Sequence, residues 1–432
     1  MTAWQKLRLI TNHFWRFLRI AILAIILVFI MTGSATPPVG LNSQVRAFTR
    51  PYHFDFGTWT LDAIGAKIAG WGWSLERFLT PAEQSQLVLD YLDQVNLVNA
   101  LNAEILAIYI DPEISSPDTI SQPLRAELQE ERDHLDSLAP VAEAILQNQL
   151  MNILHTSGLS FLGQVIPPSL YQVSELPQNL VVSPRYEIRR DMDVALSPGI
   201  TIDSRNQLET AIFSELDHAA LVVPIGGIGT YPAMVLQTSN LIRLTEVIAH
   251  EWIHNYLTLR PLGILFFVDN DLMTINETTA TIAGLELGWM IMETYYPDQI
   301  PPGTQPPKFE ISPPLAEIDL HPDAFDFHTE MRLTRVETDR LLAEGDIEGA
   351  EAYMETRRQV FWDNGFAIRR LNQAYFAFHG AYGGSPGGGA AGEDPVGPAV
   401  IKLRAQFEQL ADFVNTISWV SSYEALLRLL DQ

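Results

Sequence analysis

Three residues near the middle of the chain, His250, Glu251 and His254, have the types and the spacing of a metal site. Four residues are about one turn of an α-helix, so the two imidazoles would project from one face and could bind one Zn²⁺ at about 2.0–2.1 Å. Glu251 is rotated from His250 by roughly 100° about the helix axis. That position suits a general base acting on a zinc-bound water better than it suits a third ligand.

The segment that carries these residues is predicted to be a single helix. Ser239 or Asn240 can cap its start, and Pro261 ends it. Its flanks are strongly apolar, which indicates a buried helix. Without a metal, the two histidines would have to hydrogen-bond to their neighbours. A buried His-Glu-His cluster costs several kcal/mol unless something satisfies it, so a metal is the favoured interpretation.

A zinc enzyme with two histidine ligands needs a third protein ligand and one open position. Glu277 lies near the start of a second apolar helix, which is expected to run to about Met292 and could return antiparallel to the first. An alternative assigns Glu277 to helix capping, in a box that begins at Thr274. Other acidic residues are less well placed as ligands: Asp269 and Asp271 in the loop, and Glu286 and Glu293 further along the helix.

The two segments resemble the active-site core of the gluzincins, the thermolysin-like zinc metallopeptidases. The resemblance rests on the HExxH motif at 250–254 and the NExxA motif at 276–280, in which Asn276 matches the Asn that often precedes the ligand Glu. It implies one general base, Glu251, and three zinc ligands: His250, His254 and Glu277. The chain is also loosely similar to uncharacterised bacterial membrane-anchored aminopeptidase families that carry HExxH.

The resemblance covers only Thr245 to Ala283, about a tenth of the chain. It also departs from the thermolysin pattern, which places an aspartate four residues after the ligand glutamate to orient the first histidine. Thr281 stands at that position here. A hydroxyl is a weaker acceptor than a carboxylate, so another group is expected to orient His250.

Peptide hydrolysis also needs a group that stabilises the developing oxyanion. Tyr375, His379 and Tyr382 precede a glycine-rich loop and are the candidates, and Asn372 shares a helical spacing with the first two. The alternative for this segment is an ordinary helix end followed by glycine. Upstream of HExxH, Gly229–Val235 is expected to be an edge strand, on which a substrate could bind as an added strand; a plain edge strand is equally compatible.

The N-terminus has the pattern of a membrane signal. An unbroken apolar run from Ile20 to Met31 follows basic residues, and no acidic residue precedes it. We expect residues 14–34 to form one transmembrane helix, with a cytoplasmic N-terminus at 1–13 and the catalytic domain outside the cytoplasm. The alternative is a signal peptide, cleaved near residues 33–35, that releases a secreted protein.

The rest of the chain indicates an α+β fold that is mostly helical. After a linker at 35–44, residues 45–300 are expected to hold N-terminal helices, a small sheet and the zinc-site helices. A helical part at 301–432 is expected to complete the catalytic domain. Helices are predicted over 80–110, 123–150, 328–378 (a hairpin) and 398–430, and strands over 180–182, 186–190 and 219–224.

Composition limits the chemistry and the partners. The 432-residue chain has 52 acidic and 27 basic residues, a formal charge of −25, so nucleic acid is not expected to bind. It has no cysteine, which excludes disulfides, a cysteine nucleophile and thiolate ligands. The expected function is zinc-dependent hydrolysis of a peptide or protein, by an endopeptidase or an aminopeptidase. The alternative is a membrane-tethered, non-catalytic binding protein with a structural or vestigial zinc site.

Overall fold

The structure is a computed structural model that describes residues 40–71, 75–110, 114–309, 325–382 and 388–431, with Arg19 and Ile311 besides. The chain divides into two compact units, residues 1–47 and residues 48–432. Within the described ranges, no helix is long and apolar enough to cross a membrane. The transmembrane helix expected at 14–34 lies outside the described residues, apart from Arg19.

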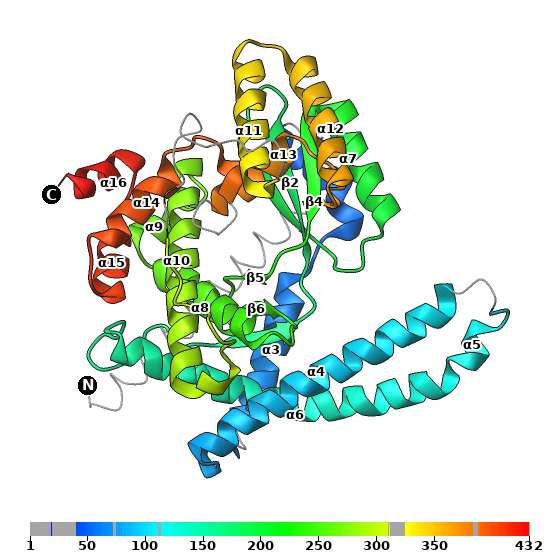
Figure 1. Ribbon diagram of the computed structural model, residues 1–432, viewed down its shortest axis with the longest axis vertical. Coiled ribbons are helices and arrows are strands. Elements are labelled where there is room, and N and C mark those ends of the chain that lie inside the picture. Colours follow the sequence, from blue (N-terminus) through cyan, green and yellow to red (C-terminus); the bar gives the residue numbers. More distant parts are fainter. Residues whose placement is uncertain are drawn as a thin grey trace, which may run out of the picture. The chain divides into compact units, whose positions relative to one another are not determined.

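Helices predominate in the described chain, which has an α+β fold (Figure 1). This agrees with the fold class expected from the sequence. The main helices are α2 (Leu41–Thr49), α3 (Phe56–Trp71), α4 (Pro81–Ile110), α6 (Gln122–Thr156), α7 (Ile202–Leu216), α8 (Leu241–Leu257), α10 (Asn270–Tyr295), α11 (Phe327–Ala343), α12 (Ile347–Asp363), α13 (Gln373–His379), α14 (Val396–Ala405), α15 (Leu410–Ile417) and α16 (Tyr423–Leu430). Shorter helical segments include α5 (Pro117–Ile120), α9 (Pro261–Ile264), η5 (Gly380–Tyr382) and η6 (Gly388–Ala391).

The long helices α4 and α6 lie side by side (Figure 1). α4 begins with the predicted capping box: the backbone N–H of Thr80 donates to Glu83 Oε2 at 2.7 Å, and the N–H of Glu83 donates to Thr80 Oγ1 at 3.4 Å. Buried side chains of α4 and α6 share one hydrophobic core with α8, α10, α14 and α15. The helices that carry the HExxH and NExxA motifs are therefore held on a large apolar core.

The single closing helix predicted over 398–430 is wrong, because three helices, α14 to α16, occupy this part of the chain. Arg404 Nη1 donates to the carbonyl of Phe407 at 2.6 Å, which gives this backbone carbonyl a hydrogen-bond partner just after α14 ends. Ser422 caps the start of α16, and its Oγ accepts the N–H of Ala425 at 3.2 Å. These local side-chain bonds divide one apolar stretch into three short helices.

Two small three-stranded sheets precede α8, where the sequence predicted one. The first has the order β3–β2–β4 and is antiparallel. The second has the order β1–β6–β5, with β1 parallel and β5 antiparallel to β6. The strands are β1 (Tyr171–Ser174), β2 (Gln178–Pro184), β3 (Met192–Leu196), β4 (His218–Val223), β5 (Gly227–Ile228) and β6 (Ala233–Leu236).

Two strand predictions need correction. Residues 186–190 form the loop between β2 and β3, because the N–H of Asp191 donates to the carbonyl of Val182 at 3.0 Å and closes the connection there. Gly229–Val235 is not an edge strand. It begins as a turn and continues into β6, which has partners on both sides. The edge strands of this sheet are β1 and β5.

The first sheet supports α13. Ala219, Leu221 and Val223 of β4 form a core with Ala374 and Phe378 of α13. The alternating residues of a strand point to one face, so these three β4 side chains are on the face that α13 covers. This packing fixes the direction of α13 and so the place of His379 at its end.

The helices α8 and α10 pack closely side by side, with β5 and β6 next to α8 (Figure 1). Two glycines of α10 allow this approach. A Cβ at Gly284 would lie 2.9 Å from His250 Cβ, and a Cβ at Gly288 would lie 2.9 Å from Glu246 Cα. His254 contacts Asn276, and Glu246 contacts Gly288. Residue numbers therefore increase in opposite directions along the two helices. α10 therefore returns antiparallel to α8, as the sequence predicted.

Candidate metal centre

The helix α8 carries His250 and His254 and forms as predicted. Asn240 caps it, and its Oδ1 accepts the N–H of Arg243 at 3.0 Å. The helix ends at Leu257, ahead of Pro261, which begins the short helix α9. The two imidazoles lie one turn apart, with ring centroids 4.7 Å from each other. Local capping and a proline stop are therefore enough to place both rings on one face.

Glu277 comes from α10, and the structure excludes its alternative role in capping. Asp269 caps this helix, since its Oδ1 accepts the N–H of Asp271 at 3.1 Å. The helix begins at Asn270, so Thr274 and Glu277 both lie inside it. Only the N–H groups of the first turn lack partners inside a helix, and Glu277 lies beyond that turn. The side chain of Glu277 is therefore available to the histidines of α8.

Three side-chain atoms converge between the two helices. The Nε2 atoms of His250 and His254 are 3.0 Å apart, and Glu277 Oε2 lies 3.7 Å from the first and 3.5 Å from the second. Ligand atoms of the three residues all lie within 4.8 Å of one another. This group could hold a metal ion, and its two nitrogens and one oxygen are donors that metal ions accept.

The chemistry of the donors fits a metal. Glu277 Oε2 is buried and has no hydrogen-bond partner among the described residues. Asn276 Nδ2 donates to the carbonyl of Leu262 at 3.2 Å, so the amide oxygen faces His254 Nδ1, at 2.8 Å. An amide oxygen only accepts, so Nδ1 of His254 carries a proton and Nε2 is the nitrogen left to bind a metal. A cation between these atoms would satisfy both Nε2 of His254 and Oε2 of Glu277.

The three residues also interact electrostatically with one another. Burial alone would raise the pKa of Glu277, yet the facing rings of His254 and His250 hold that pKa well below its usual value. Burial would lower the pKa of His254, but the carboxylate of Glu277 outweighs it and raises the pKa to about 9. A cation between these residues would therefore compete with a proton for the imidazole nitrogens.

Glu251 lies beside this group, under the edge strand β5. Its side chain is buried, and its Oε2 has no hydrogen-bond partner in the described part of the chain. Burial raises the pKa of the Glu251 carboxyl. A Cβ at Gly227 would lie 2.2 Å from Glu251 Oε1, and one at Gly229 would lie 2.7 Å from His254 Cβ. The two glycines thus let the chain around β5 lie directly against the HExxH helix.

Thr281 does not orient the first histidine. No hydrogen bond joins Thr281 to His250 among the described residues, and Gly284 packs against the Cβ of that histidine instead. Instead, a hydrogen bond to the amide oxygen of Asn276 orients the second histidine, His254. In the sequence, Asn276 stood out only through the resemblance, and this contact was not predicted.

The substrate-side candidates lie on and after α13. Asn372 caps this helix, and its Oδ1 accepts the N–H of Tyr375 at 3.0 Å. The rings of Tyr375 and His379 lie against each other, tilted by 45°, with centroids 4.3 Å apart. Tyr382 ends η5, which packs against α10. No hydrogen bond or ion pair in the described ranges joins these side chains to His250, His254 or Glu277. Burial and the charge of Arg190 lower the pKa of His379 to about 4.

Arg190, a charged residue near the metal group, was not predicted from the sequence as part of the site. It lies in the loop before β3, and its side chain is only 7% exposed. Its Nη1 is 3.0 Å from the sulfur of Met273, which precedes Glu277 by one turn of α10. Its guanidinium also lies over the ring of Phe378, 5.2 Å from the centroid. The alternating polarity of residues 186–190 suggested a strand, and nothing local pointed to the contact of Arg190 with α10.

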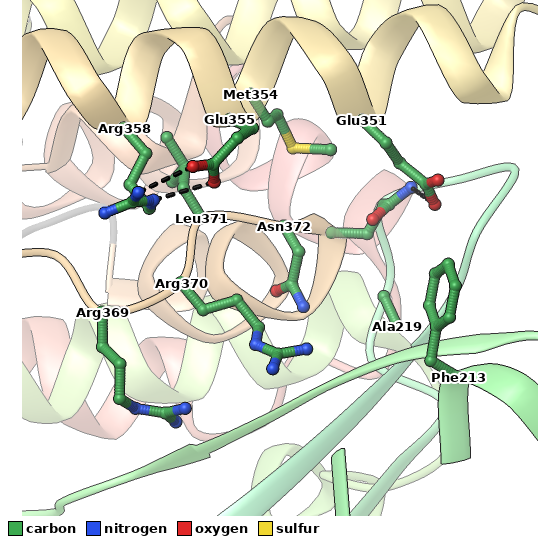
Figure 2. A pocket seen from close by; sticks show the side chains of 11 residues that line it. Phe213, Ala219, Glu351, Met354, Glu355, Arg358, Arg369, Arg370, Leu371 and Asn372 are labelled. Carbon is green, nitrogen blue, oxygen red and sulfur yellow. Dashed lines mark hydrogen bonds and ion pairs between the residues drawn. The ribbon is translucent and has the colours of Figure 1, made fainter. Parts of the chain in front are cut away.

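A separate pocket of about 430 Å³ lies at the other end of α13 (Figure 2). It is lined by three arginines, but acidic partners neutralise them. Arg358 pairs with Glu355 at 2.6 Å, and Arg369 and Arg370 pair with the fully buried Glu209 at 2.6 and 3.2 Å. This pocket is built from internal ion pairs and does not include the metal group.

No family model, curated protein or solved structure matches this chain. The function is therefore inferred from the site.

Proposed function

We propose that this chain is a metal-dependent hydrolase and, more narrowly, a zinc metallopeptidase of the gluzincin type. A site with two imidazoles, one carboxylate and no thiolate suits Zn²⁺. Three protein ligands leave one position for water or substrate, which is the pattern of catalytic zinc; structural zinc commonly has four protein ligands. The unpartnered Oε2 of Glu277 supports the ligand role.

The residues around the metal group suit hydrolysis. When bound, zinc supplies a Lewis acid for the substrate carbonyl and makes a water acidic near neutral pH. Glu251 accepts a proton from the attacking water and returns it to the leaving amine. The raised pKa of Glu251 suits both steps. A carboxylate whose pKa is closer to the working pH takes up a proton more readily and can still release it. Asn276 holds His254 with its Nε2 free for the metal.

Exposed apolar side chains next to the site favour a peptide substrate. The chain between α8 and α10 exposes Leu259, Ile264, Phe267 and Val268, each by 65% or more. The ring of Phe266, in the same stretch, lies edge-on to His254 with centroids 6.2 Å apart. Clusters of exposed apolar side chains usually mark binding surfaces. A peptide that reaches the metal group would place its side chains against this stretch.

The observation that carries the proposal is the buried carboxylate of Glu251 beside the three-residue metal group, since a structural site needs no such base. The test uses the full chain, purified in detergent. Metal analysis is expected to find one zinc per chain, and a peptide library is expected to be hydrolysed until a chelator is added. Glu251→Gln should keep the zinc and lose hydrolysis. A zinc-free wild type, or full activity in Glu251→Gln, would contradict the proposal.

We also propose that the peptidase is anchored in a membrane by residues 14–34, with its catalytic domain outside the cytoplasm. The support is the sequence pattern, an apolar run after basic residues. Membrane fractionation and protease protection test this directly. Recovery of the whole chain in a soluble cytoplasmic fraction would contradict it.

A further inference from the structure

Arg190 presents one edge of its guanidinium without a hydrogen bond. Its Nη1 contacts the sulfur of Met273 at 3.0 Å. Its Nε and Nη2 are buried, and neither has a hydrogen-bond partner in the described chain. An arginine has five N–H donors and no acceptor, and among the described residues no oxygen forms a hydrogen bond with this edge. Leaving a buried charged donor without an acceptor is costly.

The free edge has the geometry of a carboxylate site. Nε and Nη2 lie on the same side of the planar guanidinium, and such a pair of parallel N–H groups binds both oxygens of a carboxylate. Asp193 forms an ion pair with Arg190, in which Oδ2 lies 3.5 Å from Nε, too far for a good hydrogen bond. Its other oxygen accepts Asn179 Nδ2 at 2.9 Å, which holds Asp193 on the sheet.

The position of Arg190 relates this edge to the metal group. Met273 and Glu277 are four residues apart on α10, so they share a face and are separated by about 6 Å along the helix. One or two residues of extended peptide span a similar distance, at about 3.3–3.6 Å per residue. A peptide with its scissile bond at the metal could therefore bring a nearby carboxylate to Arg190.

From this geometry we infer that Arg190 binds a carboxylate of the substrate, one or two residues from the scissile bond. This inference rests on the proposed peptidase function. The carboxylate belongs either to the C-terminus of a short peptide or to an acidic side chain. The ring of Phe378 and the sulfur of Met273 hold the guanidinium in place from the protein side.

The test compares matched peptides on the full-length protein. One pair differs only in a free or amidated C-terminus, and the other in Glu or Gln near the scissile bond. We expect kcat/KM to favour the carboxylate form of one pair by about tenfold to a hundredfold, mainly through KM. In Arg190→Gln the ratio should fall to about one, and Arg190→Lys should recover part of it. Arg189→Gln, in the same loop, should keep the wild-type ratio.

The outcomes separate this inference from the peptidase itself. Hydrolysis without any preference for a carboxylate, or an equal loss for all peptides in both Arg190 variants, would overturn the role of Arg190 alone. Equilibrium binding of the same pairs to zinc-loaded protein is measured in parallel. Carboxylate-selective binding that depends on Arg190, with no hydrolysis of any peptide, would support this site and overturn the proposed function.

Discussion

Gly227 leaves room for the carboxylate of Glu251. A Cβ at this glycine would lie 2.2 Å from Oε1, 2.7 Å from Cδ and 2.9 Å from Cγ of Glu251. Such distances are well inside van der Waals contact, so any other residue at 227 must displace the glutamate or the edge strand β5. The place of the candidate base is therefore set by a residue that is distant from it in the sequence and has no side chain.

Gly227→Ala is expected to lower peptide hydrolysis strongly while zinc stays bound. The added methyl group pushes Glu251 away from its position, and general bases contribute about 10²- to 10⁴-fold to rate. We expect kcat to fall by at least about tenfold, with one zinc per chain by metal analysis. Gly226→Ala is the control, because its Cβ would meet only Arg243 Nη2 at 3.5 Å, an ordinary contact. Equal effects of the two substitutions would refute the steric explanation.

Asn276→Ala is expected to weaken zinc binding, because it removes the acceptor for Nδ1 of His254. Loss of such an orienting partner typically costs about 10- to 100-fold in metal affinity. Competition with a chelator of known affinity measures the change. Thr281→Ala is the matched control on the same helix. It should change affinity by less than about twofold, since no hydrogen bond joins Thr281 to His250. A larger effect at Thr281 than at Asn276 would contradict this assignment.

The local features of the metal centre could be predicted from the sequence. The start of α8 at Asn240, its end before Pro261 and the common face of His250 and His254 all follow from the helix period and its caps. The start of α10 was misplaced, because Thr274 and Glu277 imitate a capping box. The true cap is Asp269, which is also a residue type preferred at the start of a helix.

The parts that were missed depend on contacts between distant segments. Arg190 was assigned to a strand because its neighbours alternate in polarity, but the β2–β3 connection makes them a loop and brings Arg190 to Met273. The close contact of Gly227 with Glu251 depends on how β5 pairs with β6 and lies on α8. Pairing register is not encoded within either segment alone, so a single sequence does not reveal it.

His379 is expected to make the protein less stable in acid. Its pKa is lowered to about 4 by burial and by Arg190, so the folded state keeps the ring neutral. The unfolded chain takes up a proton as pH falls through about 6.5, and stability is lost from there down to about pH 4. Between pH 7.5 and pH 5 this group should cost about 2 kcal/mol in the free energy of unfolding.

Urea unfolding of wild type and His379→Asn at both pH values measures this cost. The variant should lose about 2 kcal/mol less than wild type on acidification. His134→Asn, at an exposed histidine on α6, should lose as much as wild type. The same acid sensitivity in all three proteins would show that His379 is not kept neutral in the folded state.

Zinc is expected to stabilise the packing of α8 against α10 through Glu277. A ligand that binds only the folded state adds RT ln(1 + [L]/Kd), or about 2.7 kcal/mol at a hundredfold excess over Kd. The melting temperature of the wild type should therefore rise with zinc and fall when a chelator is added. In Glu277→Gln most of this shift should disappear, because the carboxylate that bridges to both histidines is gone. Glu293→Gln, at an exposed position on the same helix, should keep the full shift. An undiminished shift in Glu277→Gln would mean that zinc binds at a different site.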